Sequence, residues 1–156
     1  MEIERLSSQI ELSNTSKLEA TYTQFDTLLI ELRKKKIPSQ LINRINADVV
    51  EINSFAGSGT DFGKFIKMKQ STIVNLLAKE VKIVPKNYYQ TIWMSMGMAA
   101  FGIPIGVAIG TATKNMGLLG VGLPIGLGLG VVVGRKMDEK AAKENRQLNI
   151  VLTKNF

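Results

Sequence analysis

The sequence predicts an all-α chain, in which an amino-terminal helical bundle or coiled-coil region precedes a two-helix transmembrane hairpin. Three observations predict it: residues 1–86 carry apolar residues at helical spacing, residues 87–134 are nearly free of charge, and residues 135–156 form a basic, charged tail. The 156 residues amount to about one domain's length of chain. We therefore expect a polar helical region, an apolar hairpin and a tail, in that order.

The first helix is predicted by apolar residues that recur at spacings of four and three. These residues are Leu18, Tyr22, Phe25, Leu29 and Leu32. Such spacing places them on one face of an amphipathic helix. The basic run 33–36 and then Pro38 end this helix, because cations favour a helix carboxyl end and proline cannot continue the helix.

Two further amphipathic helices are expected over residues 39–55 and 62–84, with a glycine-containing turn at 56–61 between them. Together the three helices form either a small antiparallel bundle or the arms of an oligomeric coiled coil. The choice stays open here, because a coiled coil needs three or four sustained heptads and the pattern is shorter.

The hairpin is predicted by two long runs without charge. The first covers 87–113, 27 residues, and the second covers 115–134, 20 residues, with Lys114 as the single charge between them. Roughly 20 apolar residues span a hydrocarbon core about 30 Å thick. We expect membrane spans at about 90–112 and 116–134, joined by the polar turn Thr113–Asn115, so that the chain contacts the lipid bilayer directly.

A buried hairpin in a soluble protein is the alternative. Glycine keeps this alternative open, because seven of the 20 residues in the second run are Gly and add no side-chain hydrophobicity. Against it, only about 100 other residues remain to surround two long charge-free helices, and many of those residues are charged.

Residues that flank the spans predict the orientation. Tyr88, Tyr89 and Trp93 stand at the start of the first span, where aromatic rings favour the headgroup level. Basic residues flank both outer ends, among them Lys86, Arg135 and Lys136, whereas the turn contains Lys114 alone. By the positive-inside rule both termini are expected in the cytoplasm, at a membrane crossed twice.

The composition argues against an enzyme. The chain contains no Cys and no His, which removes thiolate chemistry, the commonest metal ligand and the commonest general base. The stretch "GSGTDFGKF" fails the phosphate-loop pattern, because five residues separate its outer glycines and Phe65 follows Lys64. We expect no catalytic residue, no metal, no cofactor and no nucleic-acid partner.

Acidic residues in the predicted amphipathic helices are expected on solvated helix faces. They are Asp26, Glu31, Asp48 and Glu51. A carboxylate site for catalysis or metal binding is the less favoured interpretation of this group. The apolar region itself contains no paired carboxylates, so it lacks the groups that usually relay protons or ions.

Glycine recurs every four residues in both predicted spans. The first set is Gly102, Gly106 and Gly110; the second is Gly122, Gly126, Gly130 and Gly134. Four residues are slightly more than one helical turn, so each set forms a stripe along one side of its helix. In lipid, small residues favour helix association because they allow two backbones to approach closely.

Other small residues repeat on the opposite side of each span. They are Ala100, Ala108 and Ala112 around Pro104 in the first span, and Gly120 and Gly128 around Pro124 in the second. At about 100° per residue this second small face lies around 160° from the glycine stripe. A hairpin uses one face per helix internally, so we expect the other to contact further copies in a homo-oligomer. Both prolines predict kinks, since each removes a backbone hydrogen bond.

The motifs "GIPIGVAIG" and "GLPIGLGLGVVVG" resemble the repeat of bacterial glycine-zipper membrane proteins, and the following "RKMDEKAAKENRQLNI" is similar to the charged tail of small proteins of that kind. The resemblance covers about residues 90–150. It implies tight helix packing and oligomerisation, and it does not single out one activity, because such proteins include channels, membrane-permeabilising toxins and lipoproteins. The lipoprotein branch needs a lipidation cysteine, which this sequence lacks.

Two functions therefore follow from the sequence. The first is a scaffolding membrane protein that self-associates through its hairpin and recruits a protein partner through residues 1–86. The second is a pore-forming or membrane-perturbing protein, such as an antibacterial effector or toxin.

Overall fold

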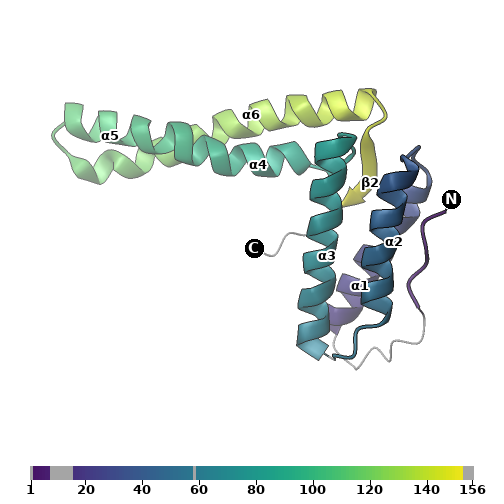
Figure 1. The fold of residues 1–156 in the computed structure, drawn as a ribbon. Helices are drawn as coiled ribbons and strands as arrows, with labels where there is room; N and C mark the ends of the chain where they lie inside the picture. The colour runs from purple at the N-terminus through teal and green to yellow at the C-terminus, as the bar shows by residue number, and fades with distance from the viewer. Residues whose placement is uncertain (1, 8–15, 58, 153–156) are drawn as a thin grey trace. The chain divides into compact units, whose positions relative to one another are not determined.

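The computed structural model describes residues 2–7, 16–57 and 59–152 (Figure 1). The chain divides into two compact units. The bundle unit comprises Met1–Pro85 and Leu148–Phe156, and the hairpin unit comprises Lys86–Gln147. The described chain is predominantly helical with one small sheet, which confirms the predicted all-α class in its main feature.

The bundle unit is built on three amphipathic helices that lie alongside one another (Figure 1). They are α1 (Ser16–Arg33), α2 (Ser39–Asn53) and α3 (Gly59–Glu80). Large apolar side chains fill the space between them, and Phe25, Leu29 and Ile66 are 0% exposed. Within one chain the three helices pack together as a bundle, and an oligomeric coiled coil stays an open prediction.

The predicted helix ends differ from the structure by a few residues. Helix α2 ends at Asn53 and α3 begins at Gly59, inside the expected turn 56–61, of which Ser58 lies outside the described residues. Helix α3 ends at Glu80 because Lys82 adopts a left-handed conformation (φ 55°) and the Ile83 N–H donates to the Leu77 carbonyl oxygen. This bond spans six positions along the chain, one more than the bond that closes a Schellman helix end.

A short sheet follows α3. Strand β1 (Val84–Lys86) pairs with β2 (Gln147–Val151), so this part of the tail is extended, and all of β2 except Gln147 belongs to the bundle unit. Along β2, Leu148 and Ile150 are buried and alternate with exposed residues, as the two-residue period of a strand requires.

Glu31 corrects the expectation of solvated acidic faces. This residue is only 8% exposed, and its carboxylate accepts hydrogen bonds from Lys34 Nζ (2.6 Å) and from the Asn149 N–H (2.9 Å). The ammonium group of Lys34 and the Asn149 N–H hold the pKa of Glu31 below its ordinary value. The expectation was wrong here because strand β2, 118 residues away in sequence, covers this side of α1.

Residues 2–7 form an extended segment along α2. Asn46 and Asn53 hold it by hydrogen bonds: the Glu4 N–H donates to Asn46 Oδ1 and the Ser7 N–H donates to Asn53 Oδ1, each over 2.9 Å. Both amide nitrogens donate back to carbonyl oxygens of the segment. Ile3 and Leu6 are buried, so the segment extends the core of the bundle.

The hairpin unit consists of two long helical arms that run side by side (Figure 1). The first arm is α4 (Tyr88–Gly97), a π-helical segment (Met98–Gly102) and α5 (Ile103–Ala112). The second arm is a 3₁₀ segment (Met116–Val121) and α6 (Gly122–Lys143). Helix α6 thus extends beyond Gly134 into the expected tail, whose last residues 153–156 lie outside the described residues.

Candidate functional site: the apolar hairpin

The two arms meet along their glycines. Gly102, Gly106 and Gly110 on the first arm are buried, and so are all four glycines of the second stripe (Gly122, Gly126, Gly130 and Gly134). Their neighbours across the contact are mostly backbone atoms of the opposite arm. The contact is therefore made by backbone against backbone.

The closeness of this contact follows from what an added methyl group would meet. A Cβ on Gly122 would lie 2.7 Å from the Gly106 Cα, and a Cβ on Gly126 would lie 2.7 Å from the Gly102 Cα. These separations are far below van der Waals contact, so alanine does not fit without moving a helix. Glycine weakens a helix by about 1 kcal/mol relative to Ala. In the hairpin this loss of helix stability accompanies a close contact between the two backbones, which only glycine allows.

Gly97 belongs to the same contact, although sequence spacing separates it from the stripe. A Cβ on Gly97 would lie 3.0 Å from the Gly130 Cα. Gly97 precedes Gly102 by five residues, and the intervening π-helical segment takes up the extra residue, because its hydrogen bonds close over five residues. The signal for this was Pro104, which cannot donate to Ala100 and favours a changed hydrogen-bond ladder just before it.

Each proline lies in the first turn of an α-helical segment. Pro104 follows the π-helical segment and Pro124 follows the 3₁₀ segment. The missing N–H of each proline therefore falls where the hydrogen-bond ladder already changes its period. A bend of the helix axis at Pro104 and at Pro124 stays a prediction.

The second small face is open. Ala100, Ala108 and Ala112 are exposed, and so are Gly120 and Gly128, both of which have no atom within 4 Å of an added Cβ among the described residues. The two stripes are thus not equivalent: glycines of the first are covered by the opposite arm, and residues of the second face outward.

The outer surface of the hairpin is apolar. Its exposed large side chains are Met96, Phe101, Ile103, Val107, Met116, Leu119, Val121, Ile125, Leu129, Val132 and Val133. The helical stretches Tyr88–Ala112 and Met116–Lys143, 25 and 28 residues, are each long and apolar enough to cross a membrane. Only 17% of the most apolar window in each is buried. The core helix of a soluble protein is mostly buried, so these two helices differ from such a helix.

Asp138 caps helix α4 at the open end of the hairpin, which is the end opposite the turn Thr113–Asn115. The sequence did not predict this role. The Asp138 carboxylate accepts hydrogen bonds from the Tyr89 N–H (3.1 Å) and the Gln90 N–H (2.9 Å), in the first turn of α4. The N-cap residue of α4, Asn87, makes no side-chain cap. A negative charge at a helix amino terminus also interacts favourably with the helix dipole. The available signal was spacing, since Asp138 follows Gly134 by four residues and so lies on the glycine side of α6.

The expected interface residues gather at the same end of the hairpin. Tyr88 and Tyr89 are half-buried, with ring centroids 5.3 Å apart in an edge-on arrangement, and Trp93 lies one turn further along α4. The basic side chains Lys86, Arg135 and Lys136 are exposed. Beyond α6, a hydrogen bond to the Glu144 carboxylate raises the pKa of Arg146. The Arg146 side chain also forms a hydrogen bond with the Tyr89 side chain.

No cluster of three or more His, Cys, Asp or Glu side chains that could hold a metal ion occurs in the part of the chain that the structure describes. The chain matches no protein-family model, no curated protein and no solved structure.

Proposed function

We propose that the chain is a small integral membrane protein whose hairpin crosses the bilayer twice, with both termini in the cytoplasm. One observation carries the proposal: two span-length helices contact each other through glycine backbones and direct their large apolar side chains outward. At 1.5 Å per residue, the 25-residue first arm extends about 37 Å, enough for a hydrocarbon core about 30 Å thick.

Self-association is the second part of the proposal. The glycine stripe is occupied within each chain, so copies associate through the exposed second small face, at Ala100, Ala108, Ala112, Gly120 and Gly128. Small residues there let helices of neighbouring copies approach closely, which is the main source of helix association in lipid. The oligomer then presents several copies of the bundle unit, which contains nearly all of residues 1–86, to a protein partner.

Disulfide crosslinking in membranes tests the self-association. The chain has no cysteine, so single cysteines can be introduced without background. We expect Ala108→Cys to form a disulfide-linked dimer under mild oxidation. Val107→Cys is the matched control, because it is exposed on the same arm but lies about 100° around the helix. Equal crosslinking at both positions, or none at Ala108→Cys, would contradict the proposal.

A pore or membrane-perturbing activity is the competing hypothesis from the sequence. The hydroxyl groups of Thr91, Thr111 and Thr113 donate to carbonyl oxygens of their own helices, which gives a polar pore lining no support. Dye leakage from liposomes that contain the purified chain separates the two functions. If the chain causes leakage, and Gly106→Leu and Gly126→Leu abolish it, the pore hypothesis would replace the scaffold hypothesis.

A further inference from the structure

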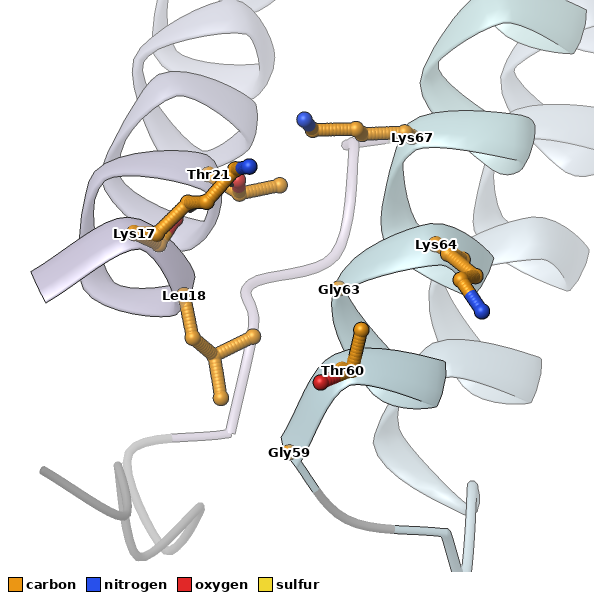
Figure 2. Close-up of a pocket in the computed structure, with 8 residues that line it drawn as sticks. All are labelled: Lys17, Leu18, Thr21, Gly59, Thr60, Gly63, Lys64 and Lys67. Carbon is orange, nitrogen blue, oxygen red and sulfur yellow. Dashed lines mark hydrogen bonds between the residues drawn. The ribbon is translucent and has the colours of Figure 1, made fainter. Parts of the chain in front are cut away.

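The bundle unit contains a basic pocket between α1 and α3. It has a volume of about 250 Å³ and is lined by Lys17, Leu18, Thr21, Gly59, Thr60, Gly63, Lys64 and Lys67. Figure 2 shows Lys17 and Lys67 extending from the two helices toward the space between them, whereas Lys64 points away from α1. No Asp or Glu is among the described residues that line the pocket. Its lining therefore combines three positive charges with two hydroxyl groups.

The lysines differ in what they can offer a ligand. Lys64 pairs with Asp61 at 3.3 Å, and both side chains are largely exposed, so this pair is weak and solvated. Lys17 and Lys67 come from different helices and converge on the pocket. Ammonium groups from two different helices match a ligand that spreads negative charge over several oxygens, as a phosphate group does.

The neutral part of the lining fits the same ligand. Gly59, Thr60 and Gly63 belong to the first two turns of α3, so the backbone has little side-chain cover there. Leu18 is buried and supplies an apolar wall, with its Cδ1 atom 3.4 Å from where a Cβ on Gly63 would stand. Gly59, Thr60 and Gly63 come from the stretch that fails the phosphate-loop pattern, and the pocket does not depend on that pattern.

We propose that this pocket binds a phosphate group, either free or as the headgroup of an anionic lipid. The proposal stands apart from membrane insertion, because every residue that it uses lies within the bundle unit. The shared chemistry is a phosphate held by Lys17 and Lys67, with the Thr60 hydroxyl as a further hydrogen-bond donor and Leu18 beside the organic part of the ligand.

The test uses the full chain in neutral detergent micelles and follows the amide NMR signals of Gly59 and Gly63. Inorganic phosphate and a short-chain phosphatidic acid are titrated separately, with a short-chain phosphatidylcholine as the neutral comparison. We expect saturable shifts with phosphatidic acid or with both phosphate probes. A response to phosphatidic acid alone assigns the site to lipid headgroups, and a response to inorganic phosphate shows that the free anion is sufficient.

Matched variants distinguish the pocket from general attraction. Lys17→Gln and Lys67→Gln should each weaken binding about fivefold, from the loss of about 1 kcal/mol per basic residue. Lys79→Gln removes an exposed charge from the same helix α3 and should leave affinity unchanged. Gly63→Ala narrows the pocket by an ordinary contact with Leu18 and should also weaken binding. Absence of saturable shifts, or equal weakening by Lys79→Gln and Lys67→Gln, would overturn the proposal.

Discussion

The bundle unit and the hairpin unit pack their helices in opposite ways. In the bundle unit, large side chains such as Phe25, Leu29 and Ile66 fill the space between helices and are fully buried. In the hairpin unit, glycines lie between the helices and large side chains such as Phe101 and Leu129 are about half exposed. One chain therefore contains both an ordinary core and a helix pair that is apolar on the outside.

The proposed membrane location of the hairpin accounts for this difference, because helix packing is driven differently in water and in lipid. In water, burial of apolar area contributes about 25 cal/mol per Å², so large side chains belong inside. In lipid that drive between helices is absent, and close van der Waals contact of backbones takes its place. In the proposed membrane location, lipid would cover the exposed apolar surface of the hairpin.

The largest expected effect comes from deleting a core side chain of the bundle. Phe25→Ala should cost about 3–5 kcal/mol of unfolding free energy, because the lost contacts leave a cavity between tightly packed helices. Ile30→Ala is the control on the same helix, since Ile30 is 42% exposed, and it should change stability by about 0.5 kcal/mol or less. Hydrogen exchange of the α1–α3 amides in the full chain measures both. Equal effects would remove the distinction between a packed and a solvated face of α1.

The converse change applies to the hairpin, where adding a side chain should destabilise. Gly126→Leu places atoms within the space of the Gly102 backbone and should cost about 1–3 kcal/mol through separation of the arms. Gly128→Leu is the control, because nothing lies within 4 Å of its added Cβ. Distances between spin labels at Met96 and Val132 should lengthen and broaden in the first variant only. If Gly128→Leu also opens the hairpin, the assignment of the two faces is wrong.

A smaller effect is expected at the open end of the hairpin. Asp138→Ala removes the acceptor for the Tyr89 and Gln90 N–H groups and should cost about 1 kcal/mol, as loss of a helix cap does. The amides of the first turn of α4 should exchange faster with solvent, while those of α5 should not change. Glu139→Ala, an exposed neighbour, serves as the control. Unchanged exchange in Asp138→Ala would show that the cap does not hold this turn.

The smallest effect is a pH dependence of the bundle unit. The pKa of Glu31 is lowered in the folded chain, so the unfolded chain binds more protons in acid. The stabilisation is therefore complete above the ordinary pKa of a glutamate and is lost as pH falls through the lowered value. Because Lys34 is 63% exposed, we expect only about 0.2–1 kcal/mol from this ion pair. In Glu31→Gln the free energy of unfolding should fall less steeply as the pH is lowered. An unchanged pH dependence would assign the acid destabilisation to other carboxylates.

Much of the fold could be predicted from local patterns. Helical spacing predicted the ends of α2 and α3 to within a few residues and the apolar face of α1, because the apolar residues of each helix recur in consecutive turns. The two arms were also predictable from a local pattern, because each lies mainly in a long run of residues without charge. The bonds from Asn46 and Asn53 to residues 2–7 had no such signal, since their partners lie 42–48 residues away.

The hairpin contact was predictable only where its spacing is regular. The four-residue glycine spacing identified seven residues that the structure places between the arms. Gly97 was hidden because a π-helical segment shifts the period by one residue. Asp138 was hidden because a charged residue in a predicted tail gives no sign that it caps a helix 48–49 residues earlier.

Cysteine labelling in intact bacterial cells tests the central claim most directly. Single cysteines replace Lys114, in the turn of the hairpin, and Lys36, after α1 in the bundle unit; both positions are exposed. We predict that a membrane-impermeant maleimide labels Lys114→Cys in intact cells and labels Lys36→Cys only after lysis, with both variants in the membrane fraction. Labelling of both positions from the same side of the membrane, or recovery of the chain in the soluble fraction, would contradict a hairpin that crosses the bilayer twice.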